Sequence, residues 1–344
     1  YYMIIHKFKK TYVGIVKNRP SKINKSPYLA DILFDGKEFM AHTPSLGLSG
    51  LIKEGSQVIM EKNENEDNVS DYKIVSVKIK EYETGNKFIY VGANPVLVNN
   101  LFIECINLNL IKFTKYKSVK CEARYNGSRI DFIFIDNSNI KHVVECKYAP
   151  TVDYHPDHKP HNKVSIGKRK NYKRASIFPD GWEYKKGAVV SERAIKHLNA
   201  LIKGISNGDR CYNFYFSLRD DVEYFRPNYE KDLIFTNLLK KAINKGVIVK
   251  AFKLKYSKTN IKFVKEKCYV STIYPDWVIR NDYYSEFGCF LDYLIRRMIA
   301  DNNKNWNNRY SGFYDKRADE VINSIFLNKR LFYKWSKYCK EIIN

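Results

Sequence analysis

The stretch formed by residues 128–147 constrains the fold of this chain more than any other part of the sequence. It holds two runs with the alternating apolar pattern of β-strands, separated by the turn-forming residues 136–139. Successive side chains of a strand point to opposite faces, so Glu145 and Lys147 share one face and Cys146 points away from it. The stretch therefore predicts a hairpin with charged groups gathered on one side.

Two carboxylates and one amine on this hairpin form a candidate cation site. If the two strands pair, Asp131 lies beside Glu145 and Lys147. Buried carboxylates are unfavourable unless they are paired or hold a cation, and one or two of them commonly bind Mg²⁺. A bound Mg²⁺ can activate water against a phosphodiester. A solvated sheet edge would suit the same residues, and this short motif alone does not separate the two interpretations.

The composition makes the chain strongly basic. It has 344 residues, and 60 Lys and Arg against 37 Asp and Glu give a formal net charge of +23. Such a surface attracts polyanions, with nucleic acid as the first candidate and an acidic membrane as the second. Abundant Lys, Asn and Ile also fit a proteome encoded by AT-rich DNA, which would raise the charge without a binding role.

Hydropathy and cysteine usage predict an intracellular protein without a membrane span. No apolar run approaches the length of about eighteen residues that a spanning helix needs, and residues 1–7 are too mixed for a secretory signal. The 7 cysteines form no CxxC pair, which argues against a zinc ribbon and a disulfide framework. We expect the cytoplasm or the nucleus, and a viral or an AT-rich microbial source both fit the composition.

Residues 1–92 are predicted to form an N-terminal domain of short strands. Gly, Asn and charged residues separate β-branched and aromatic runs, which is typical of a small OB-like β-barrel. The expected strands are 12–17, 28–34, 38–42, 57–61, 72–79 and 87–91. The glycines of segment 42–51 would let its backbone approach a ligand, although an ordinary loop explains them too.

Residues 93–274 are predicted to form an α/β domain. Apolar spacing predicts helices over 96–111, 191–205 and 229–244, with Ser191 as an N-cap and Gly246 ending the third helix. Strands are expected at 116–125, 129–135, 141–148, 211–218, 247–256 and 261–264. The resulting order α-β-β-β-α-β is that of a nuclease fold whose signature is a separated Asp plus Glu-x-Lys. Topology and motif agree, which favours the cation site over the solvated edge.

Two segments fall outside these patterns. Residues 149–187 are basic, poor in aliphatic residues and interrupted by prolines, which predicts an extended insertion. Lys168 and Arg169 lie there in a basic run that suits phosphate contact, or simply solvated charge. Residues 275–344 are predicted to be a helical C-terminal extension, a candidate for packing on the second domain or for an interface with a second copy or a protein partner.

Four patches resemble the sugar fermentation stimulation protein family, SfsA, over about residues 10–270. The patches are Tyr28-Leu29-Ala30-Asp31 with Asp35-Gly36, His42-x-Pro44-x-x-Gly47-x-x-Gly50-Leu51 with Glu54-Gly55, Gly127–Phe132 with Val144–Lys147, and Ser191-Glu192-Arg193-x-x-x-His197-Leu198. They resemble the opening strand, the HxPNxGxMxGL block, the SRIDF and VEVK strands and the TxRGxKHL helix of the family. Their order and spacing hold over most of the chain.

The resemblance implies an α+β protein with an OB-like domain, a PD-(D/E)xK nuclease-like domain, DNA binding and nuclease activity. Asp131, Glu145 and Lys147 fall on the nuclease motif. The implied ligands of Mg²⁺ or Mn²⁺ are Asp131, Glu145, the backbone carbonyl of Cys146 and Glu104, which lies on the first predicted helix.

Candidate substrate contacts come from several elements. They are Arg129, Arg193, His197, His42, Ser45, Lys168 and Arg169. A planar guanidinium such as that of Arg193 suits bidentate phosphate contact, whereas His197 can also be a satisfied core histidine. Ser45 stands where the family usually has Asn, and Ala194 replaces its Gly. The insertion and the C-terminal extension lie outside the family pattern and indicate a specialised substrate or partner.

The sequence therefore predicts a metal-dependent nuclease acting on DNA, RNA or both with little sequence specificity. The alternative is a non-catalytic nucleic-acid-binding protein, regulatory or packaging, that retains the nuclease fold. The charge of the chain suits both hypotheses, and cation binding with turnover separates them.

Overall fold

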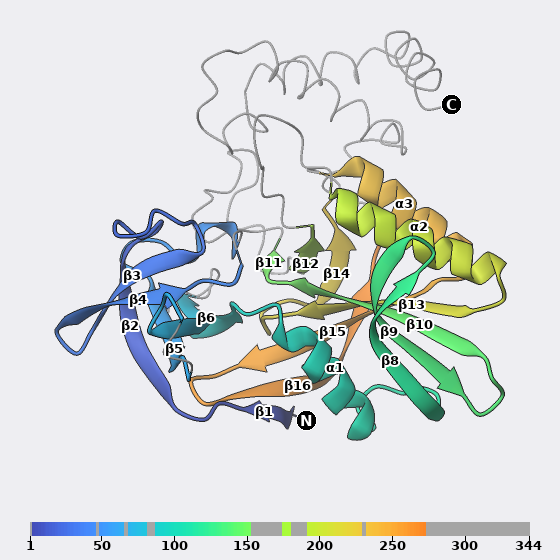
Figure 1. The fold of residues 1–344 in the computed structure, drawn as a ribbon, viewed down its shortest axis with the longest axis horizontal. Helices are drawn as coiled ribbons and strands as arrows, with labels where there is room; N and C mark the ends of the chain where they lie inside the picture. Colours follow the sequence, from blue (N-terminus) through green and yellow to red (C-terminus); the bar gives the residue numbers. More distant parts are fainter. Residues whose placement is uncertain are drawn as a thin grey trace, which may run out of the picture.

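Two β-sheets and three α-helices make up most of the regular structure of the described residues (Figure 1). The computed structural model describes residues 2–45, 48–64, 68–80, 87–152, 174–179, 191–228 and 232–272. The protein is of the mixed α+β class, as the sequence predicts. The predicted extension 275–344 and most of the predicted insertion 149–187 lie outside the described residues.

The N-terminal sheet closes on itself. Its strands are β2 (Thr11–Asn18), β3 (Leu29–Phe34), β4 (Lys37–His42), β5 (Gln57–Lys62), β6 (Tyr72–Lys80) and β7 (Phe88–Gly92). Each coincides with a predicted strand. They run in the order β4-β3-β2-β5-β6-β7, and a parallel pairing of β4 with β6 joins β2–β6 into a closed ring. Apolar side chains such as Val16, Ile32 and Val58 fill its interior.

The second sheet is larger and mixed. Its strands are β1 (Tyr2–Lys7), β8 (Tyr116–Tyr125), β9 (Ser128–Asp136), β10 (Lys141–Ala149), β11 (Thr151–Val152), β12 (Ala175–Phe178), β13 (Arg210–Ser217), β14 (Tyr224–Pro227), β15 (Ile248–Tyr256) and β16 (Asn260–Val270). The order is β11-β12-β14-β16-β15-β13-β10-β9-β8, with β1 added to β16. Strands β8, β9 and β10 are antiparallel neighbours, and β13 and β15 continue the sheet in parallel.

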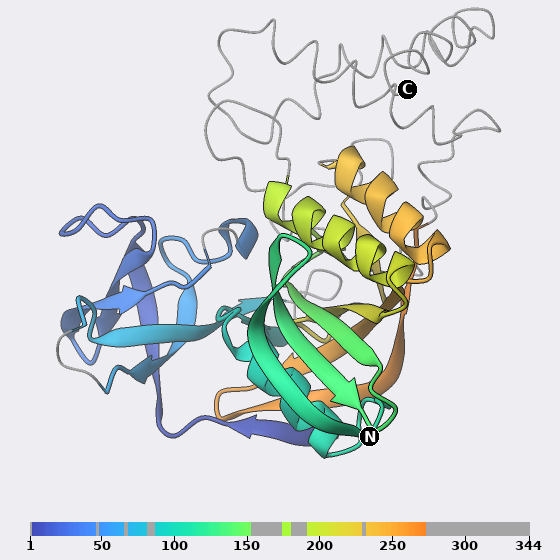
Figure 2. The ribbon, with the colours of Figure 1, turned by 45° about the vertical axis from the view of Figure 1, so that its right-hand side comes forward.

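Helices cover both faces of this sheet (Figures 1 and 2). They are α1 (Leu97–Asn107), α2 (Glu192–Ser206) and α3 (Leu233–Asn244), close to the predicted ranges. On β10, Val144 packs in the core under α1 and its neighbour Val143 packs in the core under α2 and α3. Both faces are therefore apolar, as expected of parallel strands between helices.

Gly92 joins the two sheets. Its N–H donates to the Leu218 carbonyl at 2.8 Å. A Cβ atom at this position would lie 2.4 Å from the ring of Tyr256, so only glycine permits the approach. Because β1 belongs to the large sheet and β7 ends at Gly92, the closed barrel is tied to that sheet at both of its ends.

The structure corrects several predicted boundaries. The sequence does not predict β1, β11, β12 or β14, and β11 and β12 show that residues 149–187 are not wholly an extended insertion. These strands form through long-range pairing, such as β12 with β14, and β11, β12 and β14 are too short to display an alternating pattern.

The helix starts also differ in detail. Ser191 is the N-cap residue of α2, but its hydroxyl makes no capping bond, and its backbone N–H donates to Asp232 at 2.8 Å. Helix α3 begins at Leu233 and not at residue 229. Asp232 caps it by accepting the N–H of Phe235 at 2.8 Å.

Candidate active site

Strand β9 separates from β10 at Asp131. The antiparallel register ends at the pair Val144–Phe132. Beyond it, the N–H of Cys146 donates to the Asp131 carboxylate at 2.7 Å, where a regular ladder would offer a backbone carbonyl. Ile130 packs under α2 and α3 whereas Phe132 packs under α1, so β9 turns sharply at this point. The Asp131 side chain lies in the gap between the two strands.

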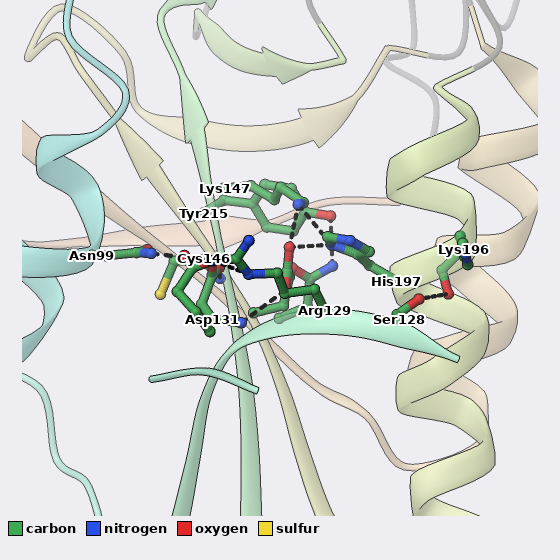
Figure 3. Close-up of polar contacts among 12 residues, drawn as sticks. Asn99, Ser128, Arg129, Asp131, Cys146, Lys147, Lys196, His197 and Tyr215 are labelled. Atoms are coloured by element: carbon green, nitrogen blue, oxygen red, sulfur yellow. Dashed lines mark hydrogen bonds and ion pairs between the residues drawn. The ribbon is translucent and has the colours of Figure 1, made fainter. Parts of the chain in front are cut away.

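Glu145 and Lys147 lie on the face of β10 that α2 covers, as the alternation of the sequence predicts. Glu145 is 1% exposed, and one of its carboxylate oxygens pairs with the Lys147 ammonium. The other oxygen accepts a long hydrogen bond of 3.4 Å from the backbone N–H of Asp131. Cys146 points to the opposite face. The contacts of Glu145 with Asp131 and Lys147 therefore bring the three residues of the predicted motif together, and Figure 3 shows Asp131 and Lys147 close to His197.

His197 enters this volume from α2. The apolar stripe of α2, including Leu198 and Leu201, is buried against the sheet, and this places the neighbouring His197 at 5% exposure. Its Nδ1 atom contacts the same Glu145 oxygen as the lysine does and lies 3.2 Å from the Lys147 ammonium nitrogen. Burial alone would raise the pKa of Glu145, but Lys147 and His197 together hold it below its ordinary value.

Asp131 has the opposite electrostatic environment. Burial, and then the charge of Glu145, raise the pKa of its carboxyl group, and Lys147 and its hydrogen bonds offset this only in part. Asn99 of α1 donates to its second oxygen at 3.1 Å. The buried Glu145 and the half-buried Asp131 thus lie side by side with one lysine, which gives the three side chains an excess of one formal negative charge for a cation to neutralise.

Asn99, Asn213 and Tyr215 belong to this site and were not predicted. In the parallel ladder, Asn213 lies opposite Glu145 and Tyr215 opposite Lys147. The Asn213 amide donates to the Tyr215 hydroxyl at 2.9 Å, and its buried Oδ1 has no hydrogen-bond partner among the described residues. Polar residues alternate with apolar ones in strand 211–218, and this alternation could have indicated that Asn213 and Tyr215 share one face of the sheet.

Several predicted site residues lie near this cluster without joining it. Arg129 is exposed and forms an ion pair with Glu122 at 2.6 Å. Arg193 is exposed one helical turn before His197. Among the described residues, no hydrogen bond or ion pair joins the Glu104 side chain to Asp131 or Glu145. The α1 residue that reaches Asp131 is Asn99.

Other predicted contacts lie on the barrel or outside the described residues. His42 ends β4 and lies beside the ring of Tyr28, with centroids 6.5 Å apart. Ser45 is 2% exposed, and its carbonyl accepts a hydrogen bond from Arg19 at 2.7 Å. Neither residue contacts the Asp131 cluster. Lys168 and Arg169 lie outside the described residues.

Two negative findings apply to the described ranges. No group of three or more His, Cys, Asp or Glu side chains there could hold a metal ion, so a cation at Asp131 and Glu145 would need neutral ligands as well. Among the helices in these ranges, none is long and apolar enough to cross a membrane.

Several known proteins are similar to this chain. The family model described as "Sugar fermentation stimulation protein RE domain" matches residues 170–260. A sugar fermentation stimulation protein homolog of Lawsonia intracellularis is 26% identical over 242 residues, covering 64% of this chain and 82% of the relative. The homolog of Clostridium tetani is 26% identical over 241 residues, covering 70% of this chain and 90% of the relative.

A solved structure has the same fold. It is SfsA of Pyrococcus furiosus in complex with Ca²⁺, and it matches with a TM-score of 0.59 at 16% sequence identity. The match covers 78% of this chain and 99% of the archaeal one. The sequence and structural similarities agree with the family resemblance described from the sequence motifs.

Proposed function

This chain belongs to the sugar fermentation stimulation protein family, and we propose that it is a divalent-cation-dependent nuclease. It would hydrolyse phosphodiester bonds in DNA, RNA or both with little sequence specificity. The observation that carries the proposal is the meeting of Asp131, Glu145 and Lys147 at the point where β9 leaves β10.

The residues at this point fit a hard divalent cation. Asp131 and Glu145 supply carboxylate oxygens, and the unpartnered Oδ1 of Asn213 lies opposite Glu145 in the ladder. Mg²⁺ usually takes one or two carboxylates and completes its shell with water, whereas Ca²⁺ takes about six to eight oxygens. The archaeal relative was solved with Ca²⁺, which supports a divalent cation here. Mg²⁺ or Mn²⁺ is proposed as the working ion.

The reaction we propose divides the work between the ion and the protein. A bound Mg²⁺ or Mn²⁺ would supply a Lewis acid that lowers the pKa of water and neutralises charge on the phosphate. Lys147 would orient the attacking water or stabilise the negative charge that develops on the phosphate. His197 contacts both Glu145 and Lys147 and so would hold the two side chains in position.

Substrate contacts are proposed for the exposed cations around the buried cluster. Arg193 lies one turn from His197 on α2, and Arg129 lies two residues from Asp131 on β9. Both can reach a phosphate without being desolvated first. The net charge of +23 supplies long-range attraction for a polyanion, and backbone contacts of this kind carry little sequence information.

The strand orders support the finer fold assignment. Helix α1 precedes β8, β9 and β10, and the connection from β10 to the parallel β13 contains β11, β12 and then α2. Apart from the two short added strands, this order fits the α-β-β-β-α-β arrangement of a PD-(D/E)xK domain. The closed ring β2-β3-β4-β6-β5 with one parallel pair supports an OB-like barrel, a fold that binds nucleic acid.

Cleavage assays on matched variants test the proposal. Wild-type protein would be incubated with single- and double-stranded DNA and RNA in Mg²⁺, Mn²⁺ or EDTA. We expect cation-dependent cleavage that Asp131→Asn and Lys147→Ala abolish and that Lys141→Ala, an exposed lysine on the same strand, retains. Absence of cleavage by the wild type, or equal cleavage by Lys147→Ala, would contradict the nuclease proposal.

The second candidate is a non-catalytic DNA- or RNA-binding protein with the same fold. It is favoured by the pairing of Glu145 with both Lys147 and His197, which gives this buried carboxylate two cationic or hydrogen-bonding partners without a metal. On this hypothesis nucleic acid binds in EDTA with a steep salt dependence, and none of the site variants changes its affinity.

A further inference from the structure

Asn99 is placed to contribute to the cation site from α1. Its Nδ2 donates to Asp131 Oδ1 at 3.1 Å, while the other Asp131 oxygen accepts the Cys146 N–H at 2.7 Å. Figure 3 shows Asn99 approaching from the side opposite to His197 and α2. Asn99 is therefore the partner of the Asp131 carboxylate on the α1 face, while the backbone N–H of Asp131 donates to Glu145 at 3.4 Å.

The site is short of oxygen ligands if Asp131 and Glu145 act alone. No third acidic, histidine or cysteine side chain in the described residues completes a metal-binding group. Glu104 follows Asn99 by five residues, which at about 100° and about 1.5 Å per residue puts it about 140° around the helix and about 7.5 Å further along. Glu104 therefore faces away from the carboxylate that Asn99 contacts.

We infer that Asn99 provides the oxygen ligand of α1 to the divalent cation that Asp131 and Glu145 hold, by inverting its side-chain amide. This inference rests on the cation site of the proposed function. The amide has a donor and an acceptor at nearly equivalent positions, and a half-turn of its last torsion exchanges them. The N–H faces the carboxylate when no cation is bound, and Oδ1 faces the cation when one is present.

A neutral ligand at this position has an electrostatic consequence. The formal charges of the Asp131, Glu145 and Lys147 side chains sum to −1, so a divalent cation changes that sum to +1. A glutamate in place of Asn99 would leave it at zero. The amide therefore gives a weaker cation site that is more attractive to a phosphate, which suits an ion that binds together with its polyanionic substrate.

Cation titrations of the full chain test this inference. Ca²⁺ and Mn²⁺ would be titrated calorimetrically into metal-free wild type, Asn99→Leu, Asn99→Asp and Asn100→Leu. Asn100 is the exposed neighbour of the same residue type and is the matched control. We expect Asn99→Leu to weaken binding on the order of 10- to 100-fold, the range seen when groups around a metal site are removed. Asn100→Leu should bind as the wild type does.

The Asn99→Asp variant separates two roles of Asn99, as a ligand of the cation or as a hydrogen-bond donor that only positions Asp131. It keeps an oxygen, adds a charge and loses the N–H, so a ligand role predicts binding at least about tenfold tighter than the wild type. A donor role predicts weaker binding. Thermal unfolding of each variant in EDTA confirms that it is folded.

A spectroscopic readout that needs no turnover complements the titrations. The side-chain amide resonances of Asn99 should shift when Ca²⁺ is added, whereas those of Asn100 should not. If the wild type binds Ca²⁺ but Asn99→Asp binds no more tightly, or if Glu104→Gln loses affinity as Asn99→Leu should, the inference is overturned and the proposed function survives. If the wild type binds no divalent cation, the proposed function fails as well.

Discussion

Replacing Lys147 by methionine should destabilise the protein, because it removes a cation from a carboxylate that is almost fully buried. Methionine keeps most of the unbranched apolar stem of lysine and removes the ammonium group, with its charge and its hydrogen-bond donors. The Glu145 side chain is 1% exposed and that of Lys147 is 14% exposed, so water replaces the lost ammonium poorly. The effect should therefore appear in folding stability even before catalysis is measured.

The contacts of Glu145 set the expected size of this effect. Removing one partner of a buried ion pair typically lowers the free energy of unfolding by about 3–5 kcal/mol, because the other charge stays buried without compensation. His197 still contacts one Glu145 oxygen, and the Asp131 N–H still reaches the other at 3.4 Å. We therefore expect roughly half of that cost, about 2 kcal/mol, which corresponds to a decrease of about 4–8 °C in Tm for a domain of this size.

Urea unfolding in EDTA of the wild type, Lys147→Met, Glu145→Gln and the double variant measures this coupling. The double variant should regain most of the lost stability, because the buried Glu145 carboxylate that the lysine neutralises is then also gone. Lys141→Met, on the exposed end of the same strand, is the matched control and should lie within about 0.5 kcal/mol of the wild type. A bound divalent cation should replace the lysine charge, so Ca²⁺ should stabilise Lys147→Met more than the wild type.

A wild-type stability of Lys147→Met in EDTA would refute this reasoning, because Glu145 would then not depend on the lysine. The reasoning would also be refuted if the stability loss of the double variant equalled the sum of the losses of Lys147→Met and Glu145→Gln.

Two further sites give predictions away from the cation site. Asp221→Asn should lower the free energy of unfolding in urea by about 3–5 kcal/mol, because its carboxylate is 3% exposed and pairs with two buried arginines. The control Asp220→Asn should lower it by less than about 1 kcal/mol, because Asp220 pairs with the half-exposed Lys255. Burial alone would raise the pKa of Asp221, but the two arginines hold it below its ordinary value. The stability that this carboxylate contributes is therefore lost as the pH falls through the lowered pKa. Asp221→Asn should accordingly flatten the acid side of the curve of unfolding free energy against pH. Gly204→Ala should lower stability by about 1–3 kcal/mol, since its Cβ would lie 2.1 Å from the Tyr125 hydroxyl, and the exposed Lys203→Ala should not change Tm.

Local periodicity was sufficient to predict most of the elements and part of the site. Alternation within residues 141–148 placed Glu145 and Lys147 on one face, and the helical stripe of 191–205 located α2. These patterns depend only on residues close in sequence, which is why they were readable. His197 came from the family resemblance, and the structure brings it to within contact of Glu145.

Contacts across the sheet were not readable in this way. Asn213 and Tyr215 reach the site because β13 pairs in parallel with β10 in one particular register, and no local pattern specifies that register. Strand β1 pairs with β16, some 250 residues away, and its exposed edge gives it an incomplete apolar pattern. Glu104 was predicted as the α1 ligand from the family resemblance, whereas the α1 side chain that donates to Asp131 is Asn99, which no local pattern singles out.

The break at Asp131 explains why the site draws residues from both helical layers. A continuous sheet separates its two faces completely, so a side chain of α1 could not share a ligand with one on the α2 face. The pairing of β9 with β10 starts only at Phe132, so the Asp131 carboxylate occupies the place of a backbone carbonyl. It can be reached by Asn99 from one face and approached by Glu145 from the other. Restoring the ladder, by any change that moves Asp131 out of the gap, would leave two half-sites on opposite faces, neither with enough oxygen ligands to hold a divalent cation.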